Sequence, residues 1–231
     1  MRFLAWDELP DAMKNEAVRP YYDSLKRKRF QLVMKRCFDI VMSSLLLVLL
    51  SPVFLVLAIA IKLDSPGPVF YRQERVTQYG KRFHIFKFRT MCDRADQMGS
   101  AVTTGGDSRI TRVGAKIRDY RLDEISQLID VLRGTMTFVG TRPEAVRYVD
   151  AYTPEMMSTL LLPAGVTSTA SIRFKDEAEL LDSSDDVDKV YVELVLPQKM
   201  LYNLEDVLQV GTLHDLNLLV KTVTAVMNEK G

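Results

Sequence analysis

The sequence predicts an α+β protein: a small, helix-rich cytosolic domain with a short β-hairpin, anchored by an N-terminal re-entrant membrane helix that is broken at Ser51-Pro52. Three observations lead to this prediction. Residues 40–61 form an uncharged apolar segment. Residues 69–91 alternate between apolar and polar side chains, which is typical of paired strands. Within residues 109–134, apolar side chains recur at helical spacing, which predicts two helices.

Length and composition limit the class of protein. The chain has 231 residues, 47% hydrophobic and 26% charged, as in globular proteins. We expect a basic amphipathic segment at 1–34, the membrane hairpin at 35–63, and the cytosolic domain with an amphipathic C-terminal extension at 64–231. The net charge of +1 gives no overall field for nucleic acid, so none is expected as a partner. Cys37 and Cys92 have no zinc-site or disulfide spacing and are expected to be reduced. The acidic N-terminus does not resemble a cleaved signal peptide.

The apolar segment has several interpretations. As a straight helix, residues 40–61 would measure about 33 Å, enough to cross a hydrocarbon core of about 30 Å. A single transmembrane anchor is one reading, and a buried core helix is another. However, Pro52 lies at the centre, where it removes a backbone donor and clashes with the preceding turn, so the helix is expected to bend there. The Val48 carbonyl then loses its partner, and the Ser51 hydroxyl is positioned to replace it.

Basic residues flank the segment on both sides. Lys35 and Arg36 precede it, and five more follow it: Lys62, Arg72, Arg75, Lys81 and Arg82. The positive-inside rule places each flank on the cytoplasmic side. A hairpin that enters and leaves by one face satisfies this rule, so we favour it over a span. The wider basic run at 26–36 is expected to meet an anionic surface, and the acidic run at 176–188 to be a solvated loop.

An adjacent acid pair, Asp123 and Glu124, lies in "RLDEISQL". Basic residues surround it in sequence: Arg72, Arg75, Lys87, Arg89, Arg109, Arg112, Lys116, Arg118, Arg121, Arg133 and Arg142. Several alternate with aromatic residues beside the membrane segment, which favours a phosphate-rich ligand at headgroup level over a plain solvated basic face.

Two chemical roles suit the acid pair. Carboxylates beside phosphates can hold Mg²⁺, or one carboxylate can attack phosphorus while nearby cations neutralise the phosphate charge. Asp123 at the first turn of a helix would be kept ionised by the helix dipole. The non-catalytic alternative for Asp123 is helix capping.

Four stretches follow one another along the chain: "KRCFDIVMSSLLLVLLSPVFLVLAIAIKLDSPGPVFYRQERV", "FKFRTM", "DSRITRVGAKIRDYRLDEISQLIDVLRGTMTFVGTRPE" and "PAGVTS". In order and spacing these motifs resemble the bacterial sugar transferase family of monotopic polyprenyl-phosphate phosphoglycosyl transferases. The resemblance runs from about Lys35 to Thr167. It implies an enzyme at the cytoplasmic face of the bacterial inner membrane. The enzyme transfers a phosphosugar from a UDP-sugar to polyprenyl (undecaprenyl) phosphate and releases UMP. This is the first membrane step of an exopolysaccharide, capsule, O-antigen or glycoprotein glycan.

The resemblance also assigns residues. It implies a ping-pong reaction in which Asp123 is the nucleophile, with Asp123 and Glu124 as Mg²⁺ ligands. Its motifs give five candidate substrate-binding residues, to which we add Arg173 for nucleotide contact: Lys87, Arg89, Arg118, Arg142, Pro143 and Arg173. Expected partners are the UDP-sugar, polyprenyl phosphate and membrane lipids, with a homodimer left open. Two alternatives remain: a membrane-anchored glycosyl transferase that releases UDP, and a non-catalytic membrane adaptor.

The chain departs from the family pattern at a few positions. Ser126 replaces the usual proline after "LDEI", and Thr141 replaces the first proline of Pro-Arg-Pro. Thr77-Gln78 alters the usual Val-Gly. The region after Gly165 lacks the common Gly-Trp-Ala-Gln run, so the sugar is not predicted. Because proline preorganises a first helical turn, Ser126 is expected to loosen this turn slightly.

Overall fold

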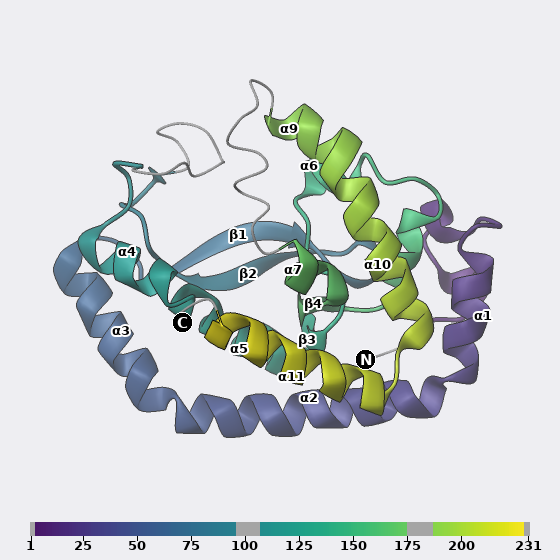
Figure 1. Ribbon diagram of the computed structural model, residues 1–231, viewed down its shortest axis with the longest axis horizontal. Helices are drawn as coiled ribbons and strands as arrows, with labels where there is room; N and C mark the ends of the chain where they lie inside the picture. Colours follow the sequence, from purple (N-terminus) through teal and green to yellow (C-terminus); the bar gives the residue numbers. More distant parts are fainter. Residues whose placement is uncertain (1–2, 96–106, 175–186, 229–231) are drawn as a thin grey trace.

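The computed structural model describes residues 3–95, 107–174 and 187–228 (Figure 1). It has the predicted α+β class: many helices surround two small sheets, and a long bent helical pair runs along one edge. The acidic run at 176–188 and the polar stretch at 93–108 lie mostly outside the described residues.

The N-terminal residues are part of the main hydrophobic core. Two 3-10 turns, Trp6–Glu8 and Asp11–Met13, lead into α1, Arg19–Arg27. Their buried side chains pack with those of later segments in one cluster, which includes Leu9, Met13, Tyr22, Leu25, Leu161 and Met200. The amphipathic segment expected at 1–34 therefore has its apolar face against the domain. The boundary expected at Lys35 lies within a continuous helix, α2.

The bent pair consists of α2, Arg29–Leu49, and α3, Ser51–Asp64, which meet at 60°. Ser51 Oγ donates to the Val48 carbonyl at 2.8 Å, as the sequence predicted. No single described helix is long and apolar enough to cross a bilayer, whereas the two together have the necessary length and composition.

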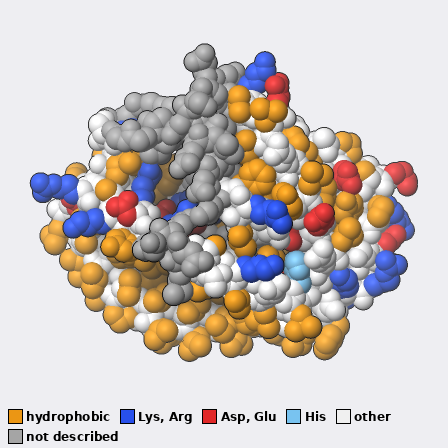
Figure 2. Space-filling model, viewed as in Figure 1, with side chains coloured by type: hydrophobic (Ala, Val, Ile, Leu, Met, Phe, Trp, Pro, Cys, Tyr) orange, Lys and Arg blue, Asp and Glu red, His pale blue; other side chains and the backbone are white. Residues whose placement is uncertain are grey.

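The outer face of this pair is apolar and exposed. Its exposed large side chains are Phe30, Val33, Met34, Ile40, Val41, Leu45, Val48, Leu49, Val53, Leu55, Val56, Ile59 and Leu63. Figure 2 shows hydrophobic side chains gathered along the edge that α2 forms in Figure 1. The buried-core-helix interpretation is therefore wrong. A contiguous apolar face of this kind marks an interaction surface rather than a free aqueous one.

The predicted β-hairpin is confirmed. Strands β1, Phe70–Val76, and β2, Arg82–Phe88, pair antiparallel, with Phe70 opposite Phe88 and Val76 opposite Arg82. The connecting 3-10 turn, Gln78–Gly80, takes positive φ at Tyr79 and Gly80, which is how a tight connection reverses the chain.

The two predicted helices that follow are also present. Helix α4, Arg112–Asp119, is followed by η5, a 3-10 helix over Leu122–Gln127, and by α5, Leu128–Arg133. Gly134 ends α5 with φ of 85°, the left-handed conformation that glycine adopts readily.

A second, two-stranded sheet follows these helices. Strand β3, Met136–Val139, pairs in parallel with β4, Ala164–Thr167. Short helices lie between and after them: α6 at Val146–Val149, a 3-10 helix at Met156–Leu161, and α7 at Thr169–Arg173. The β3–β4 pairing joins residues far apart in sequence, so local pattern alone did not reveal β4.

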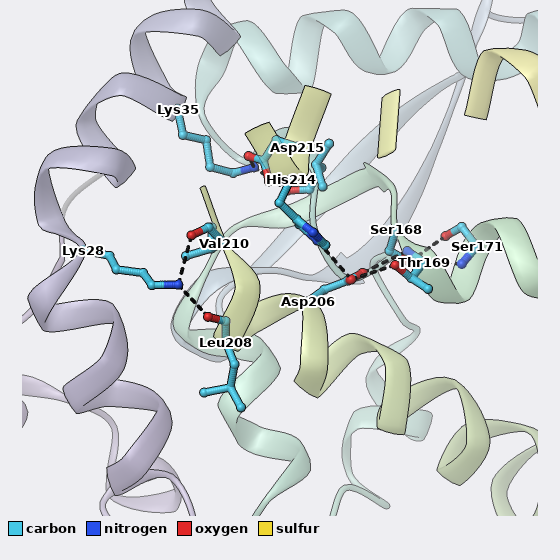
Figure 3. A network of polar contacts seen from close by, with 11 residues as sticks. Lys28, Lys35, Ser168, Thr169, Ser171, Asp206, Leu208, Val210, His214 and Asp215 are labelled. Atoms are coloured by element: carbon cyan, nitrogen blue, oxygen red, sulfur yellow. Dashed lines mark hydrogen bonds and ion pairs between the residues drawn. The ribbon is translucent and has the colours of Figure 1, made fainter. Parts of the chain in front are cut away.

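The C-terminal extension consists of α9, Val187–Val190, a π-helical turn at Tyr191–Val195, α10, Leu196–Gln209, and α11, Thr212–Asn228. Figure 3 shows how the start of the bent pair holds the junction of α10 and α11: Lys28, the residue between α1 and α2, donates through Nζ to the carbonyls of Leu208 at 2.6 Å and Val210 at 3.2 Å. Lys35 Nζ pairs with Asp215 Oδ2 at 2.6 Å. Part of the basic run at 26–36 thus binds the domain itself rather than an external anionic surface.

Candidate active site

The acid pair lies on η5, which is fixed to β2 through one strand residue, Phe86. Ser126 Oγ lies 3.0 Å from the Phe86 carbonyl and 3.1 Å from the Asp123 carbonyl. Asp130 Oδ2 accepts from the Phe86 amide at 2.8 Å. The expectation that Ser126 loosens the turn relative to proline stays a prediction, and its buried hydroxyl joins η5 to the sheet. The next strand residue, Lys87, is thereby placed beside the acid pair.

Glu124 is held by cations from two other segments. Lys87 Nζ, from β2, lies 3.1 Å from Glu124 Oε1. Arg142, from the loop after β3, donates through Nη2 to Oε1 and lies 3.4 Å through Nη1 from Oε2. Burial opposes ionisation of Glu124, but the charges of Arg142 and Lys87 outweigh it and hold the pKa of this carboxyl well below its ordinary value. Glu124 is thus a fixed anion that joins three segments.

Asp123 has a different electrostatic setting. Burial raises the pKa of the Asp123 carboxyl, and the adjacent Glu124 charge raises it further, while the charges of Lys87 and Arg118 oppose the rise. Asp123 does lie in the first turn of η5, as expected, but burial and the Glu124 charge outweigh the groups that lower its pKa. Among the described residues, no other side chain donates a hydrogen bond to this carboxylate. Two neighbouring carboxylates with pKa values pushed apart are typical of groups with separate chemical roles.

Arg118 lies on α4 beside the acid pair. Its Nε donates to Thr90 Oγ1 at 2.8 Å. Burial lowers the pKa of its guanidinium, while the nearby Asp123 charge raises it. The structure therefore brings Lys87, Arg118 and Arg142 together around Asp123 and Glu124, as the predicted site requires.

Three other predicted substrate-binding residues lie differently. The guanidinium of Arg89 is buried and donates to the carbonyls of Pro66 at 2.6 Å and Ser65 at 2.8 Å, so it braces the turn after α3. Pro143 is buried next to Arg142. Arg173 is exposed at the end of α7, with its guanidinium 4.7 Å from the ring centroid of Tyr202. The binding roles of these residues stay predictions.

The bacterial sugar transferase family matches residues 30–229. The chain belongs to this family. It is 46% identical over 99 residues to the UDP-N-acetylgalactosamine-undecaprenyl-phosphate N-acetylgalactosaminephosphotransferase of Aeromonas hydrophila, covering 43% of this chain and 23% of that protein. It is 44% identical over 119 residues to the UDP-glucose:undecaprenyl-phosphate glucose-1-phosphate transferase of Caulobacter vibrioides, covering 50% of this chain and 45% of that protein.

This chain covers a larger share of a third relative's length. The exopolysaccharide production protein PSS of Rhizobium leguminosarum bv. phaseoli is 40% identical over 149 residues, covering 62% of this chain and 74% of that protein. By contrast, this chain spans less than half of the length of each of the first two relatives.

The oxygen donors at this site can be compared with those that Mg²⁺ prefers. Among the described residues, no three metal-binding side chains converge. Both Glu124 oxygens accept from cationic side chains, which leaves the Asp123 carboxylate as the better oxygen ligand. Mg²⁺ commonly takes one or two carboxylates together with phosphate oxygens, so this arrangement fits Mg²⁺ carried by a diphosphate.

One group near the site was missed from the sequence. Glu144, two residues after Arg142, accepts from the Tyr191 hydroxyl at 2.6 Å, and Lys199 Nζ donates to that hydroxyl at 2.9 Å. The Glu144 carbonyl accepts from the Val76 amide at 3.0 Å. The Arg142 loop is thus fixed between β1 and α10. Because these partners lie far apart in sequence, no local pattern signalled the cluster.

Thr77, one of the departures from the family pattern, also has a structural role. Its Oγ1 donates to the Thr135 carbonyl at 2.6 Å and accepts from the Ala164 amide at 3.1 Å. These contacts join the end of β1 to the starts of β3 and β4.

Proposed function

We propose that this sugar transferase moves a sugar phosphate from a UDP-sugar to polyprenyl (undecaprenyl) phosphate and releases UMP, as the first membrane step of a bacterial glycan. The observation that carries this proposal is the acid pair: Asp123 is half-buried next to a fixed anion, Glu124, with the charges of Lys87 and Arg118 near Asp123 and Arg142 paired with Glu124. The names of two relatives, which are undecaprenyl-phosphate sugar-phosphate transferases, support the substrate class.

The proposed chemistry has two displacements at one phosphorus. In the first, a carboxylate oxygen of Asp123 attacks the sugar-bearing phosphorus, and the bond to the bridging oxygen breaks, so UMP leaves with the electron pair. In the second, a phosphate oxygen of the polyprenyl phosphate attacks the same phosphorus and displaces the Asp123 carboxylate. The products are UMP and a polyprenyl-diphosphate sugar, and Asp123 is regenerated.

The surrounding side chains make this attack feasible. An anionic nucleophile meets an anionic diphosphate, so positive charge must be in place before the attack. Lys87 and Arg118 lie close enough to Asp123 to stabilise its ionised form. Glu124 keeps Lys87 and Arg142 in position. Bound Mg²⁺, held by Asp123 and the diphosphate oxygens, would neutralise further phosphate charge.

We further infer that α2 and α3 enter the bilayer as a re-entrant hairpin from the cytoplasmic face of the inner membrane. The 60° bend, the Ser51–Val48 contact, the exposed apolar face and the basic flanks support this inference. A polyprenyl phosphate presents its phosphate at the headgroup level, where a site carried next to this hairpin can reach it.

A panel of UDP-sugars tests the proposal. The enzyme is incubated with undecaprenyl phosphate and Mg²⁺, and the nucleotide product is identified. We expect UMP from at least one sugar nucleotide and no UMP with Asp123→Asn, because an amide is a poor nucleophile. Asp119→Asn, which changes an exposed acid on the neighbouring helix, serves as the matched control and should keep the wild-type rate. Release of UDP would favour the glycosyl transferase alternative, and no turnover with any UDP-sugar would favour the adaptor.

A further inference from the structure

Arg75 lies on the same face of the β-hairpin as Lys87. In the register, Tyr71 is opposite Lys87 and Arg75 is opposite Phe83. Residues directly opposite each other, and alternate residues along a strand, project to one face of a sheet. Arg75 and Lys87 therefore both face the side of the hairpin that meets Glu124 and the Arg142 loop. The Val76 amide, next to Arg75, is bonded to that loop at the Glu144 carbonyl.

The half-buried guanidinium of Arg75 has no carboxylate partner among the described residues. Its Nη2 donates to the neutral side chain of Gln73 at 2.7 Å. Glu144, an acid close enough to attract it, has its Oε1 engaged by Tyr191 and Lys199. Burial lowers the pKa of the Arg75 guanidinium, attraction by Glu144 raises it, and repulsion by Arg142 lowers it again. The guanidinium is half-buried, and the acid that attracts it is already engaged by two other groups, so this arrangement indicates a place for an anion.

The balance of charged side chains around the acid pair also indicates a place for an anion. Lys87 and Arg142 share one carboxylate, that of Glu124. Arg75 and Arg118 each donate to a neutral side chain. Lys87, Arg142, Arg75 and Arg118 face the two carboxylates of Asp123 and Glu124, while Glu144 is paired with Lys199, so these side chains carry an excess of positive charge that suits an anionic phosphate substrate.

The position of Arg75 along β1 indicates which of the two phosphate-bearing substrates it binds, the UDP-sugar or the polyprenyl phosphate. The strand begins at Phe70, which packs with Leu57 and Ile61 of α3, the helix proposed to enter the membrane. Arg75 lies five residues further on, roughly 16 Å along a strand. A lipid phosphate arrives from the membrane end of this strand, whereas a water-soluble nucleotide can occupy the end far from it.

We propose that Arg75, together with Arg142, forms an anion subsite for the nucleotide phosphate of the donor, the one that leaves as part of UMP. This subsite rests on the proposed function and adds a substrate-binding residue to it. A guanidinium suits the role because its planar fork donates two parallel hydrogen bonds to a phosphate.

Binding of UMP to the full chain in detergent, measured by isothermal titration calorimetry, tests the subsite. We expect Arg75→Gln to weaken UMP binding by about 10- to 100-fold, as loss of charge-assisted hydrogen bonds does. Arg75→Lys keeps the charge but loses the planar guanidinium, so it should weaken UMP binding less. This variant also tests the subsite if Arg75→Gln does not fold. Arg82→Met, an exposed cation on the same hairpin with 62% of its side chain accessible, should bind UMP as the wild type does.

Steady-state kinetics separate the two phosphate sources. The KM for the UDP-sugar should rise in Arg75→Gln, while the KM for undecaprenyl phosphate stays unchanged. Wild-type affinity for UMP in both Arg75 variants, or a rise confined to the KM for undecaprenyl phosphate, would overturn the subsite and leave the proposed function standing. A wild-type chain that binds no UMP would contradict the proposed function itself, and the subsite with it.

Discussion

The contact between Lys35 and the domain gives a prediction whose magnitude follows from the structure. Lys35 Nζ donates to the Val139 carbonyl at 2.7 Å and pairs with Asp215 Oδ2 at 2.6 Å. The side chains of Lys35 and Asp215 are only 5% and 13% exposed. The substitution Lys35→Met keeps the apolar stem but removes the charge. Asp215 is then left as a buried carboxylate without its cation, and the Val139 carbonyl loses its donor.

Removing one partner of a buried ion pair costs roughly 3–5 kcal/mol of folding free energy. For a chain of this size, each kcal/mol lowers the unfolding midpoint by about 2–4 °C. The Tm of Lys35→Met is therefore expected to fall by roughly 6–20 °C. The double variant Lys35→Met/Asp215→Leu leaves no unpaired charge, so it should recover part of this loss.

Thermal unfolding in detergent, followed by tryptophan fluorescence, measures these differences. Lys26→Met is the matched control, because Lys26 belongs to the same basic run but is exposed. Its Tm should stay within about 2 °C of the wild type, as expected for a surface substitution. The reasoning would be refuted if Lys35→Met had the same Tm as the Lys26→Met control, or if the double variant had a lower Tm than Lys35→Met.

Three further predictions concern the site and the hairpin. Lys87→Met removes a cation that lowers the pKa of Asp123, so this pKa should rise. In a pH profile of kcat/KM for UMP release, the acidic limb should then move to higher pH. An acidic limb that stays in place or moves to lower pH would contradict the assignment. Ser126→Ala leaves the Phe86 carbonyl without the serine hydroxyl and should cost about 1–2 kcal/mol, seen as a lower Tm; an unchanged Tm would show that the contact does not contribute. In cells, a Lys62→Cys variant that keeps Ser51-Pro52 should resist a membrane-impermeant maleimide. Adding Ser51→Leu and Pro52→Leu should straighten the helix and expose the cysteine at position 62 to the reagent. Labelling of this cysteine while Ser51-Pro52 is present would contradict the hairpin.

Local patterns were sufficient for several parts of the fold. Alternation predicted the hairpin of β1 and β2, and helical spacing predicted the start of η5 near Leu122 and its continuation as α5 to Gly134. The chemistry of proline predicted the break at Pro52 and the contact of Ser51 with Val48. In each case the decisive interaction joins residues that are close in sequence.

Features that depend on distant contacts escaped sequence reasoning. Strand β4 pairs with β3 across more than twenty intervening residues. Arg89 matched a family motif, yet its guanidinium packs against the turn at Ser65, and a strand pattern does not show where a long side chain ends. Lys28 and Lys35 looked available to an anionic surface, but each binds the distant junction of α10 and α11. The partners of a charged side chain are fixed by tertiary packing, which composition does not reveal.

The most direct test of the central claim is to detect the adduct on Asp123. The enzyme is incubated with a UDP-sugar that it turns over and without polyprenyl phosphate, quenched, digested with trypsin and analysed by mass spectrometry. The account predicts a phosphosugar on Asp123 within the peptide Leu122–Arg133, and its disappearance when undecaprenyl phosphate is added before the quench. An unmodified peptide at every time point, while the polyprenyl-diphosphate sugar forms once acceptor is present, would contradict it.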